Sequence, residues 1–272
     1  MKQLQVITLI LIQMVACAQA QNVDQARKLF QTKQDSVIWV TGVATLSFTA
    51  SDSKDAGMTP PDEEVKVESL ATLVDASGVA VAVLSQLDPA RNMNNRPLRT
   101  ARGPMKLETT ATLKDLKLVL ADGSEILADI VLKDEDLDLA FVRARAEGGN
   151  TNGVVFPALN LKDNVTANVL DEAISITRLD ETFNRAPNVF ASHINMATRK
   201  PRVFYRAIGA TGGCPTFSAE GKLIGITSAR MIKGKQAAAA IVPATEILEG
   251  LEQIKSNKQS SGAGSTNAST KP

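Results

Sequence analysis

The chain has 272 residues, of which 44% are hydrophobic and 22% are charged. This length and apolar fraction allow a sizeable core and exclude a chain that is disordered throughout. Lys and Arg number 30 and Asp and Glu number 29, which gives a formal net charge of +1. The chain as a whole therefore has no field that would attract nucleic acid or an anionic membrane, and no nucleic-acid partner is expected.

Residues 1–20 have the features of a secretory signal peptide. Lys2 precedes an apolar stretch over residues 6–16, and the small-x-small triplet Ala18-Gln19-Ala20 follows it. The stretch is short for a membrane span, so we expect cleavage after Ala20 and a mature chain without a transmembrane span. The pattern predicts a secreted or periplasmic protein.

The two cysteines, Cys17 and Cys214, leave one alternative open. Val15-Ala16-Cys17 resembles a lipoprotein box, which would leave the protein lipid-anchored through Cys17. Cleavage after Ala20 would instead remove Cys17 and leave Cys214 alone, so that no intramolecular disulfide could form. The fold must then depend on its hydrophobic core.

After a predicted helix over residues 23–33, most of the chain predicts short β-strands separated by Gly, Asp and Asn. The expected strands cover residues 36–50, 65–74, 78–87, 116–121, 125–134, 137–144, 173–179, 188–197, 201–208, 222–231 and 237–244. Closely spaced strands of this kind predict barrels or a sandwich. A second helix is expected over residues 243–257, because Pro243 lies near its start and apolar residues recur on one face.

Two polar insertions and the C-terminal end predict irregular structure. Residues 51–64 contain a Pro pair and mixed charge, which favours a loop. Residues 88–106 contain five basic residues and no acidic residue after Asp88, which predicts a solvated basic loop or a local anion or partner site. Residues 258–272 lack apolar residues that could pack, so a disordered tail is expected.

The most specific pattern lies between Leu120 and Ala144. Asp122-Gly123 forms a turn signal, Ala128 and Asp134 follow, and Asp138 directly precedes an apolar strand. This pattern resembles the HtrA/Deg group of trypsin-like serine proteases, in which the Asp before the strand belongs to the catalytic triad. Every position of the pattern matches without a gap.

Two further segments agree with this family in the required order. Asp75 to Val79 resembles the hairpin that leads to the catalytic His, and Pro215 to Ser228 resembles the sequence after the nucleophile. The resemblance implies an all-β fold with two chymotrypsin-like barrels and a cleft between them, with short helices at both ends. We expect a signal peptide over residues 1–20, a first unit over 21–150, a second over 151–257 and a tail over 258–272.

The resemblance also assigns the triad positions, and these are degenerate. The catalytic His falls at Ser85 and the Asp at Asp138. The nucleophile falls at Gly212 in the register without a gap, which places Cys214 at a glycine position. A register with one inserted residue places the nucleophile at Thr211 instead. Neither register retains the serine.

Efficient hydrolysis by the triad is therefore not expected. A serine hydroxyl at position 85 cannot accept a proton near neutral pH, and loss of base or nucleophile costs about a million-fold in turnover in a comparable protease. Asp138 is then expected to cap nearby backbone N–H groups. One rescue is conceivable, in which backbone dipoles at the Gly-rich turn lower the pKa of Cys214 and the only histidine, His193, acts as base.

The sequence thus predicts a secreted or envelope-located pseudoprotease that binds a peptide or protein ligand in the cleft between the barrels. The first alternative is a diverged endopeptidase that uses Thr211 or Cys214. The second is a structural β domain of an envelope assembly, with the basic 88–106 segment as its docking surface. No metal-like cluster of His and Cys, phosphate loop or dinucleotide motif occurs, so no cofactor is expected.

Overall fold

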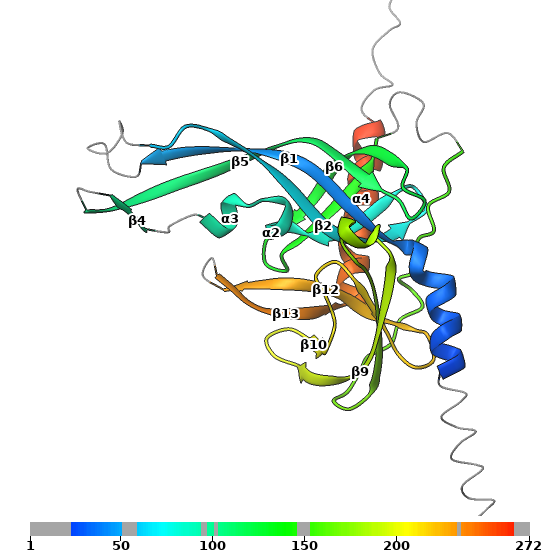
Figure 1. Cartoon of the computed structure of the whole chain (residues 1–272). Coiled ribbons are helices and arrows are strands. Elements are labelled where there is room, and N and C mark those ends of the chain that lie inside the picture. The colour runs from blue at the N-terminus through cyan, green and yellow to red at the C-terminus, as the bar shows by residue number, and fades with distance from the viewer. Residues whose placement is uncertain are drawn as a thin grey trace, which may run out of the picture.

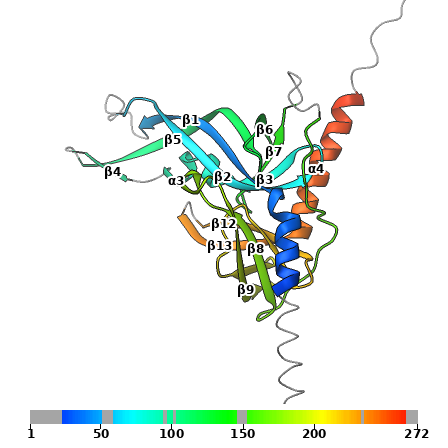
Figure 2. The same ribbon diagram turned by 45° about the vertical axis from the view of Figure 1, so that its right-hand side comes forward.

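In the computed structural model, two closed antiparallel barrels of six strands each form the body of the protein (Figures 1 and 2). The structure describes residues 23–50, 59–93, 97–100, 103–145, 153–232 and 235–263. The first barrel contains β1 (Val37–Ala50), β2 (Glu63–Asp75), β3 (Val79–Val83), β7 (Leu139–Ala144), β6 (Glu125–Asp134) and β5 (Gly103–Val119), in that order. The barrel closes through the pairing of β1 with β5. β4 (Pro97–Thr100) pairs with the first residues of β5.

The second barrel has the spatial order β10-β13-β12-β11-β8-β9. Its strands are β8 (Glu172–Arg178), β9 (Pro187–Thr198), β10 (Phe204–Ala207), β11 (Pro215–Phe217), β12 (Leu223–Ile232) and β13 (Lys235–Pro243). The helical elements are a helix over residues 23–33, η1 (Gln34–Ser36), α2 (Leu84–Leu87), α3 (Ala90–Met93), η3 (Glu181–Phe183) and α4 (Ala244–Ala263). The expected two-barrel chymotrypsin-like fold is confirmed.

β3 shows why the two barrels form one body. All five of its residues are buried, because successive side chains point to opposite faces of the strand and both faces are covered. Ala80 and Ala82 belong to the core of the first barrel. Val79 and Val81 belong to a second cluster that also contains residues of the second barrel and of α4. The hydrophobic core thus continues across the interface.

α4 closes this shared cluster from outside both barrels. Its apolar face, Ile247, Leu251 and Ile254, is buried in the cluster, as the sequence periodicity predicts. A Cβ added at Gly250 would lie 2.5 Å from the Phe141 ring, so this glycine allows α4 to approach the first barrel closely. The helix extends past residue 257 to Ala263, and residues 264–272 lie outside the described part of the chain.

One buried arginine joins the barrels at a second place. Arg178, in β8, donates hydrogen bonds to the backbone carbonyls of Val37, Gln34 and Arg185. Its guanidinium also lies 3.3 Å from the carboxylate of Asp35. Gln34 precedes the first barrel and Val37 begins its first strand. The Arg178 side chain therefore fixes the start of that barrel against the second barrel.

The prediction of a loop over residues 88–106 is wrong. This segment contains α3, β4 and the start of β5, and β4 pairs with β5 from Pro97↔Lys106 to Thr100↔Gly103. Figure 1 shows β4, β5 and β1 projecting together beyond the barrel. Polar residues such as Thr110 pair there with equally polar residues such as Ser47, so the hydrophobic alternation that marks a half-buried strand is absent.

The expected strand over residues 78–87 is also shorter than predicted, because the chain turns into α2 at Leu84. Two further expectations fall outside the described residues. The signal peptide and the lipoprotein box lie within residues 1–22, and the expected boundary at residue 150 lies within residues 146–152. These expectations remain predictions.

Candidate functional site at the degenerate triad

The structure places Ser85 directly against Asp138. β3 leads into α2, which contains Ser85, and Asp138 immediately precedes β7, the neighbour of β3 in the sheet. The backbone N–H of Ser85 donates to Oδ1 of Asp138 at 2.9 Å, and its hydroxyl donates to Oδ2 at 2.6 Å. The hydroxyl therefore occupies the position beside the carboxylate that the resemblance assigns to an imidazole.

Asp138 is fully buried, and its surroundings determine its charge state. Burial raises the pKa of this carboxyl, while the hydrogen bonds from Ser85 and the charge of Arg91 act in the opposite direction. The Nε of Arg91 lies 3.8 Å from Oδ1 of Asp138. Asn92 donates to the carbonyl of Ser85 at 3.1 Å. The carboxylate thus holds α2 in place and faces a guanidinium from α3.

The turn that would present a nucleophile, Gly209 to Cys214, is held against both barrels. The N–H of Gly213 donates to the carbonyl of Thr227 at 2.7 Å, and the Gly213 carbonyl accepts from the Thr72 hydroxyl at 2.7 Å. A Cβ added at Gly213 would lie only 1.9 Å from the Leu70 carbonyl oxygen. Only glycine permits this approach of the turn to β2.

Gly212 faces the segment that contains Ser85. A Cβ added there would lie 2.8 Å from Cγ2 of Val83 and 3.5 Å from Nε2 of Gln86. Thr211, by contrast, is exposed. Gly212 is thus the one of the two residues that packs against the segment containing Ser85, and Val83 fills the space that a side chain at position 212 would need.

The environment of Cys214 contradicts the expectation of an activated thiol. Cys214 is fully buried, and its Sγ accepts from the N–H of Thr211 at 3.1 Å. Burial raises the pKa of the thiol to about 11, despite the opposing effects of the hydrogen bond from the Thr211 N–H and of the contact with the Thr227 hydroxyl. The rescue required backbone dipoles that lower this pKa, but the turn packs against the first barrel and covers the sulfur.

His193 lies on an exposed position of β9, paired with Glu172 of β8. Within the described residues no hydrogen bond joins His193 to Thr211 or Cys214. The structure therefore brings Ser85 and Asp138 into contact and places Gly212 against Val83 and Gln86, close to Ser85 in the sequence, and it leaves the imidazole elsewhere.

Several residues of this site were not found from the sequence. Gln86 accepts a hydrogen bond from the Ser69 hydroxyl at 2.8 Å, and Arg91 and Asn92 contact Asp138 and Ser85. Arg91 is the first cation of the 88–106 segment, and no motif distinguishes it from the other basic residues there. Its role becomes visible only when α3 is placed beside Asp138.

An extended ligand could reach this site along β12. Residues 223–226 of β12 pair with β11 and Thr227 exchanges backbone hydrogen bonds with Gly213 and Cys214, whereas no described strand continues the pairing with residues 228–232 on that side. Beside this edge, a pocket of about 220 Å³ lies between residues 206–210 and the strands β12 and β13. Its lining is mostly small and apolar, with Ala207, Ala210, Ala239 and Ala240.

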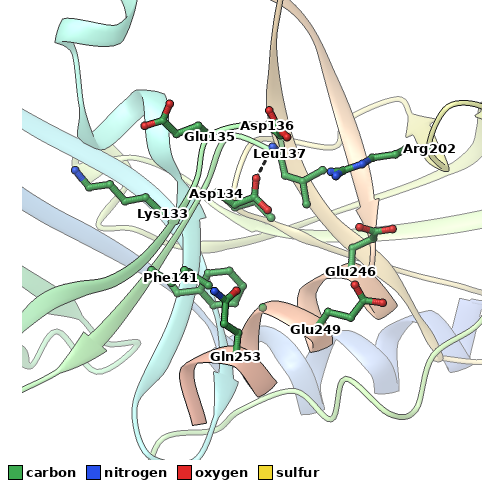
Figure 3. Close-up of a pocket in the computed structure, with 13 residues that line it drawn as sticks. Lys133, Asp134, Glu135, Asp136, Leu137, Phe141, Arg202, Glu246, Glu249 and Gln253 are labelled. Carbon is green, nitrogen blue, oxygen red and sulfur yellow. Dashed lines mark hydrogen bonds between the residues drawn. The ribbon is translucent and has the colours of Figure 1, made fainter. Parts of the chain in front are cut away.

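A separate cavity of about 470 Å³ lies between α4 and the turn from β6 to β7 (Figure 3). Its walls carry both acidic and basic side chains, among them Asp136, Glu246, Glu249 and Arg202. In the part of the chain that the structure describes, no group of three His, Cys, Asp or Glu side chains could hold a metal ion. No helix among the described residues is both long and apolar enough to cross a membrane.

Comparison with known proteins establishes the fold. No family model matches the sequence, and no curated protein matches it. Three solved structures are similar: the HtrA-type protease AlgW with tripeptide, the same protease with decapeptide, and the serine endoprotease from Yersinia pestis.

Their TM-scores are 0.51, 0.50 and 0.52, and their sequence identities are 18%, 18% and 12%, respectively. The matches cover 84%, 85% and 84% of this chain and 63%, 67% and 66% of the three known chains. The chain therefore spans about two thirds of their length. By its architecture, this protein has the chymotrypsin-like two-barrel fold of the HtrA-type serine proteases.

Proposed function

We propose that this protein is a non-catalytic, peptide-binding protein of the cell envelope that uses a protease fold. The observation that carries the proposal is the position beside Asp138, which the hydroxyl of Ser85 fills. A hydroxyl cannot take a proton from a nucleophile near neutral pH. The chain's only histidine, His193, lies on the exposed side of β9.

The nucleophile is equally deficient. Gly212 has no side chain, and the exposed hydroxyl of Thr211 has no base among its described hydrogen-bond partners. Because burial raises the pKa of Cys214 to about 11, only about one thiol in ten thousand is ionised at pH 7. Gly212 therefore lacks a reactive atom, Thr211 lacks a base, and Cys214 lacks the ionised form that would attack a substrate.

Peptide binding needs none of these groups. An extended peptide can add to an open strand edge through main-chain hydrogen bonds, while pockets beside the edge select its side chains. The edge of β12 beyond Thr227 and the pocket at Ala207, Ala210 and Ala240 provide both elements. The structures of the similar protease AlgW were determined with a tripeptide and with a decapeptide, which supports a peptide ligand for this fold.

An envelope location follows from the signal pattern in residues 1–20, with a lipid anchor on Cys17 as the alternative. Mass spectrometry of the protein from its native membrane and soluble fractions distinguishes the two. A chain that begins at Gln21 supports cleavage after Ala20, and a chain that begins at an acylated Cys17 supports the anchor. A chain that still begins at Met1 would contradict both.

Hydrolysis is tested with casein and with a fluorogenic peptide. We expect no turnover above that of a buffer control, because the base is missing at position 85. Turnover that disappears in both Thr211→Ala and Ser85→Ala, or in Cys214→Ala, would contradict the proposal and establish the diverged endopeptidase. A catalytically competent HtrA-type protease serves as the positive control.

Peptide binding is tested by fluorescence anisotropy with a labelled decapeptide of Ala and Val. Ala210→Leu narrows the pocket beside β12 and should weaken binding by about tenfold, which corresponds to about 1.4 kcal/mol. The control is Ala121→Leu, which adds the same side chain at an exposed turn of the first barrel. Absence of binding by the unmodified protein would contradict the proposal and favour a structural envelope domain.

A further inference from the structure

The second barrel contains a pocket that neither the degenerate triad nor the peptide edge explains. It lies between the segment 165–172, which leads into β8, and the turn from β11 to β12, and its volume is about 420 Å³. Three carboxylates line it, those of Asp171, Glu172 and Glu220. None of its described lining residues is basic, and the charge of Lys222 acts on Glu220 from outside the lining.

A buried hydroxyl in the same pocket lacks a hydrogen-bond partner. Ser218 is only 9% exposed, and its Oγ makes no hydrogen bond of normal geometry with any described residue. Its interaction with the Glu220 carboxylate is the largest effect that lowers the pKa of that carboxyl, and the charge of Lys222 lowers it further. An unpaired buried hydroxyl costs free energy, and a ligand that supplies an N–H would remove this cost.

The apolar residues of the pocket lining fit a ligand that also has an alkyl part. The buried side chains of Ala167 and Ile224 give the pocket an apolar wall. Immediately before Asp171, Val169 and Leu170 are 51% and 77% exposed. Long basic side chains combine an alkyl stem with a charged head, and the stem packs on apolar surface while the head reaches polar groups.

We propose that this pocket binds a lysine or arginine side chain of a partner protein. The carboxylates of Glu220 and Asp171 attract its charge, the Oγ of Ser218 accepts one of its N–H groups, and Ala167 and Ile224 contact its alkyl stem. A metal ion is a poorer fit, because these carboxylates do not form a metal-binding group within the described chain. The site is separate from the peptide edge of β12.

The cavity in Figure 3 shows why acidity alone does not identify such a site. It is also lined by carboxylates, namely Asp134, Glu135, Asp136, Glu246 and Glu249. It contains its own cations, Lys133 and Arg202, and none of its lining side chains is a buried group without a hydrogen-bond partner. This cavity therefore serves as the internal control.

The test is an NMR titration of the isotopically labelled protein with Nα-acetyl-lysine amide and Nα-acetyl-arginine amide. The uncharged Nα-acetyl-norleucine amide is the matched control for the alkyl stem. We expect the backbone amides of Thr166, Ala219 and Glu220 to shift with the two basic probes, with dissociation constants in the millimolar range. Added salt should weaken this binding, since it screens partly exposed charges.

Two substitutions within the pocket and one in the control cavity decide the proposal. Ser218→Ala and Glu220→Gln should each weaken binding of the basic probes by about tenfold, because each removes a hydrogen bond to a charged group. Glu246→Gln should leave it unchanged. The same spectra show whether each variant is folded. Equal shifts with the norleucine probe, or folded Ser218→Ala and Glu220→Gln variants that bind as tightly as the unmodified protein, would overturn the proposal.

Discussion

The carboxylate half of the site, Asp138 with Ser85, and the nucleophile half that the resemblance assigns, the turn at Gly212 and Gly213, belong to different barrels and are held in place by different forces. In the first barrel, Asp138 accepts two hydrogen bonds from Ser85 and faces Arg91. In the second barrel, the turn at Gly212 and Gly213 lies so close to the Val83 side chain and the Leu70 backbone that no room is left for a side chain. The carboxylate half depends on polar complementarity and the nucleophile half on close packing.

This difference concerns the structural task of each half. The carboxylate satisfies backbone and side-chain donors at α2, and the glycine turn joins the two barrels. Both tasks are structural, so each half is expected to respond to a different kind of substitution. Removal of a hydrogen-bond acceptor should affect the first half, and addition of a single methyl group should affect the second.

The largest effect is expected for Gly213→Ala. Gly213 has φ +83°, and an added Cβ would overlap the carbonyl oxygen of Leu70, so the turn must move away from β2. We expect a loss of more than about 3 kcal/mol in the free energy of unfolding. Chemical denaturation measures this loss.

Gly123→Ala is the matched control for this substitution. Gly123 also has φ +83°, but no atom lies within 4 Å of its added Cβ. Its cost should therefore be the conformational penalty alone, about 1 kcal/mol. If the two variants lose the same stability, the contact between the turn and β2 is not important.

Asp138→Ala should follow, with a loss of about 3 kcal/mol. The substitution leaves the N–H and hydroxyl of Ser85 without an acceptor and the Arg91 guanidinium without its buried partner. Ser85→Ala removes only one of these hydrogen bonds and should cost about 1 kcal/mol. Thermal or urea unfolding of both variants measures the difference. Equal losses would show that the carboxylate does not organise α2.

Packing at Gly212 should have a smaller effect, which a double-mutant cycle can isolate. Gly212→Ala places a methyl group 2.8 Å from Cγ2 of Val83, and we expect a loss of about 1–2 kcal/mol. Val83→Ala removes the methyl groups that occupy this space and lowers the free energy of unfolding, because it leaves a cavity. The double variant should be more stable than the sum of the single losses predicts, by about 1 kcal/mol. Additive losses would mean that the two positions are not in contact.

The predictable part of this site follows from residue spacing. The motif around Asp138 and the hairpin before Ser85 placed both residues from sequence, because adjacent antiparallel strands bring the ends of β3 and β7 together. The start of α2 was missed, since the apolar run Val79 to Leu84 continues without a change of period. Periodicity alone cannot show where such a run leaves the sheet.

The remaining errors concern contacts between segments that are distant in the sequence. The Gly-rich turn before Cys214 left open a thiol with a lowered pKa, but the turn packs against the first barrel and Cys214 is buried. Arg91 belongs to a basic segment that looks uniformly solvated, and only the tertiary fold places it beside Asp138. Burial by another barrel is not encoded in the local pattern of either segment.

Two buried or half-buried carboxylates should give opposite pH dependences. Burial raises the pKa of Asp138 above its ordinary 3.8, so the folded protein favours the protonated form of this carboxyl. The stability that this preference contributes is lost as the pH rises from 3.8 through the raised value. Burial alone would also raise the pKa of Asp75, but hydrogen bonds from Lys255 and Ser77 lower it to about 2. The stability that Asp75 contributes is therefore present above pH 3.8 and lost as pH falls towards 2.

Unfolding measured between pH 2 and 7 separates these signs. Relative to Asp138→Asn, the unmodified protein should lose stability as pH rises above about 4. Relative to Asp75→Asn, it should lose stability as pH falls below about 4, by no more than about 1 kcal/mol because solvent screens the ion pair with Lys255. The same sign for both variants would contradict the assigned environments.

The smallest effects on stability are expected at Thr211, and they sharpen the contrast with Cys214 three residues later. Thr211→Ala removes an exposed side chain and should change the free energy of unfolding by less than about 0.5 kcal/mol.

Cys214 should not react with a thiol reagent at pH 8 in the folded protein, because burial both blocks access and raises its pKa to about 11. In a Cys17→Ser background, denaturant should release one reactive thiol. Rapid labelling of the folded protein would instead mean that the turn opens, and the nucleophile half would then not be held by packing.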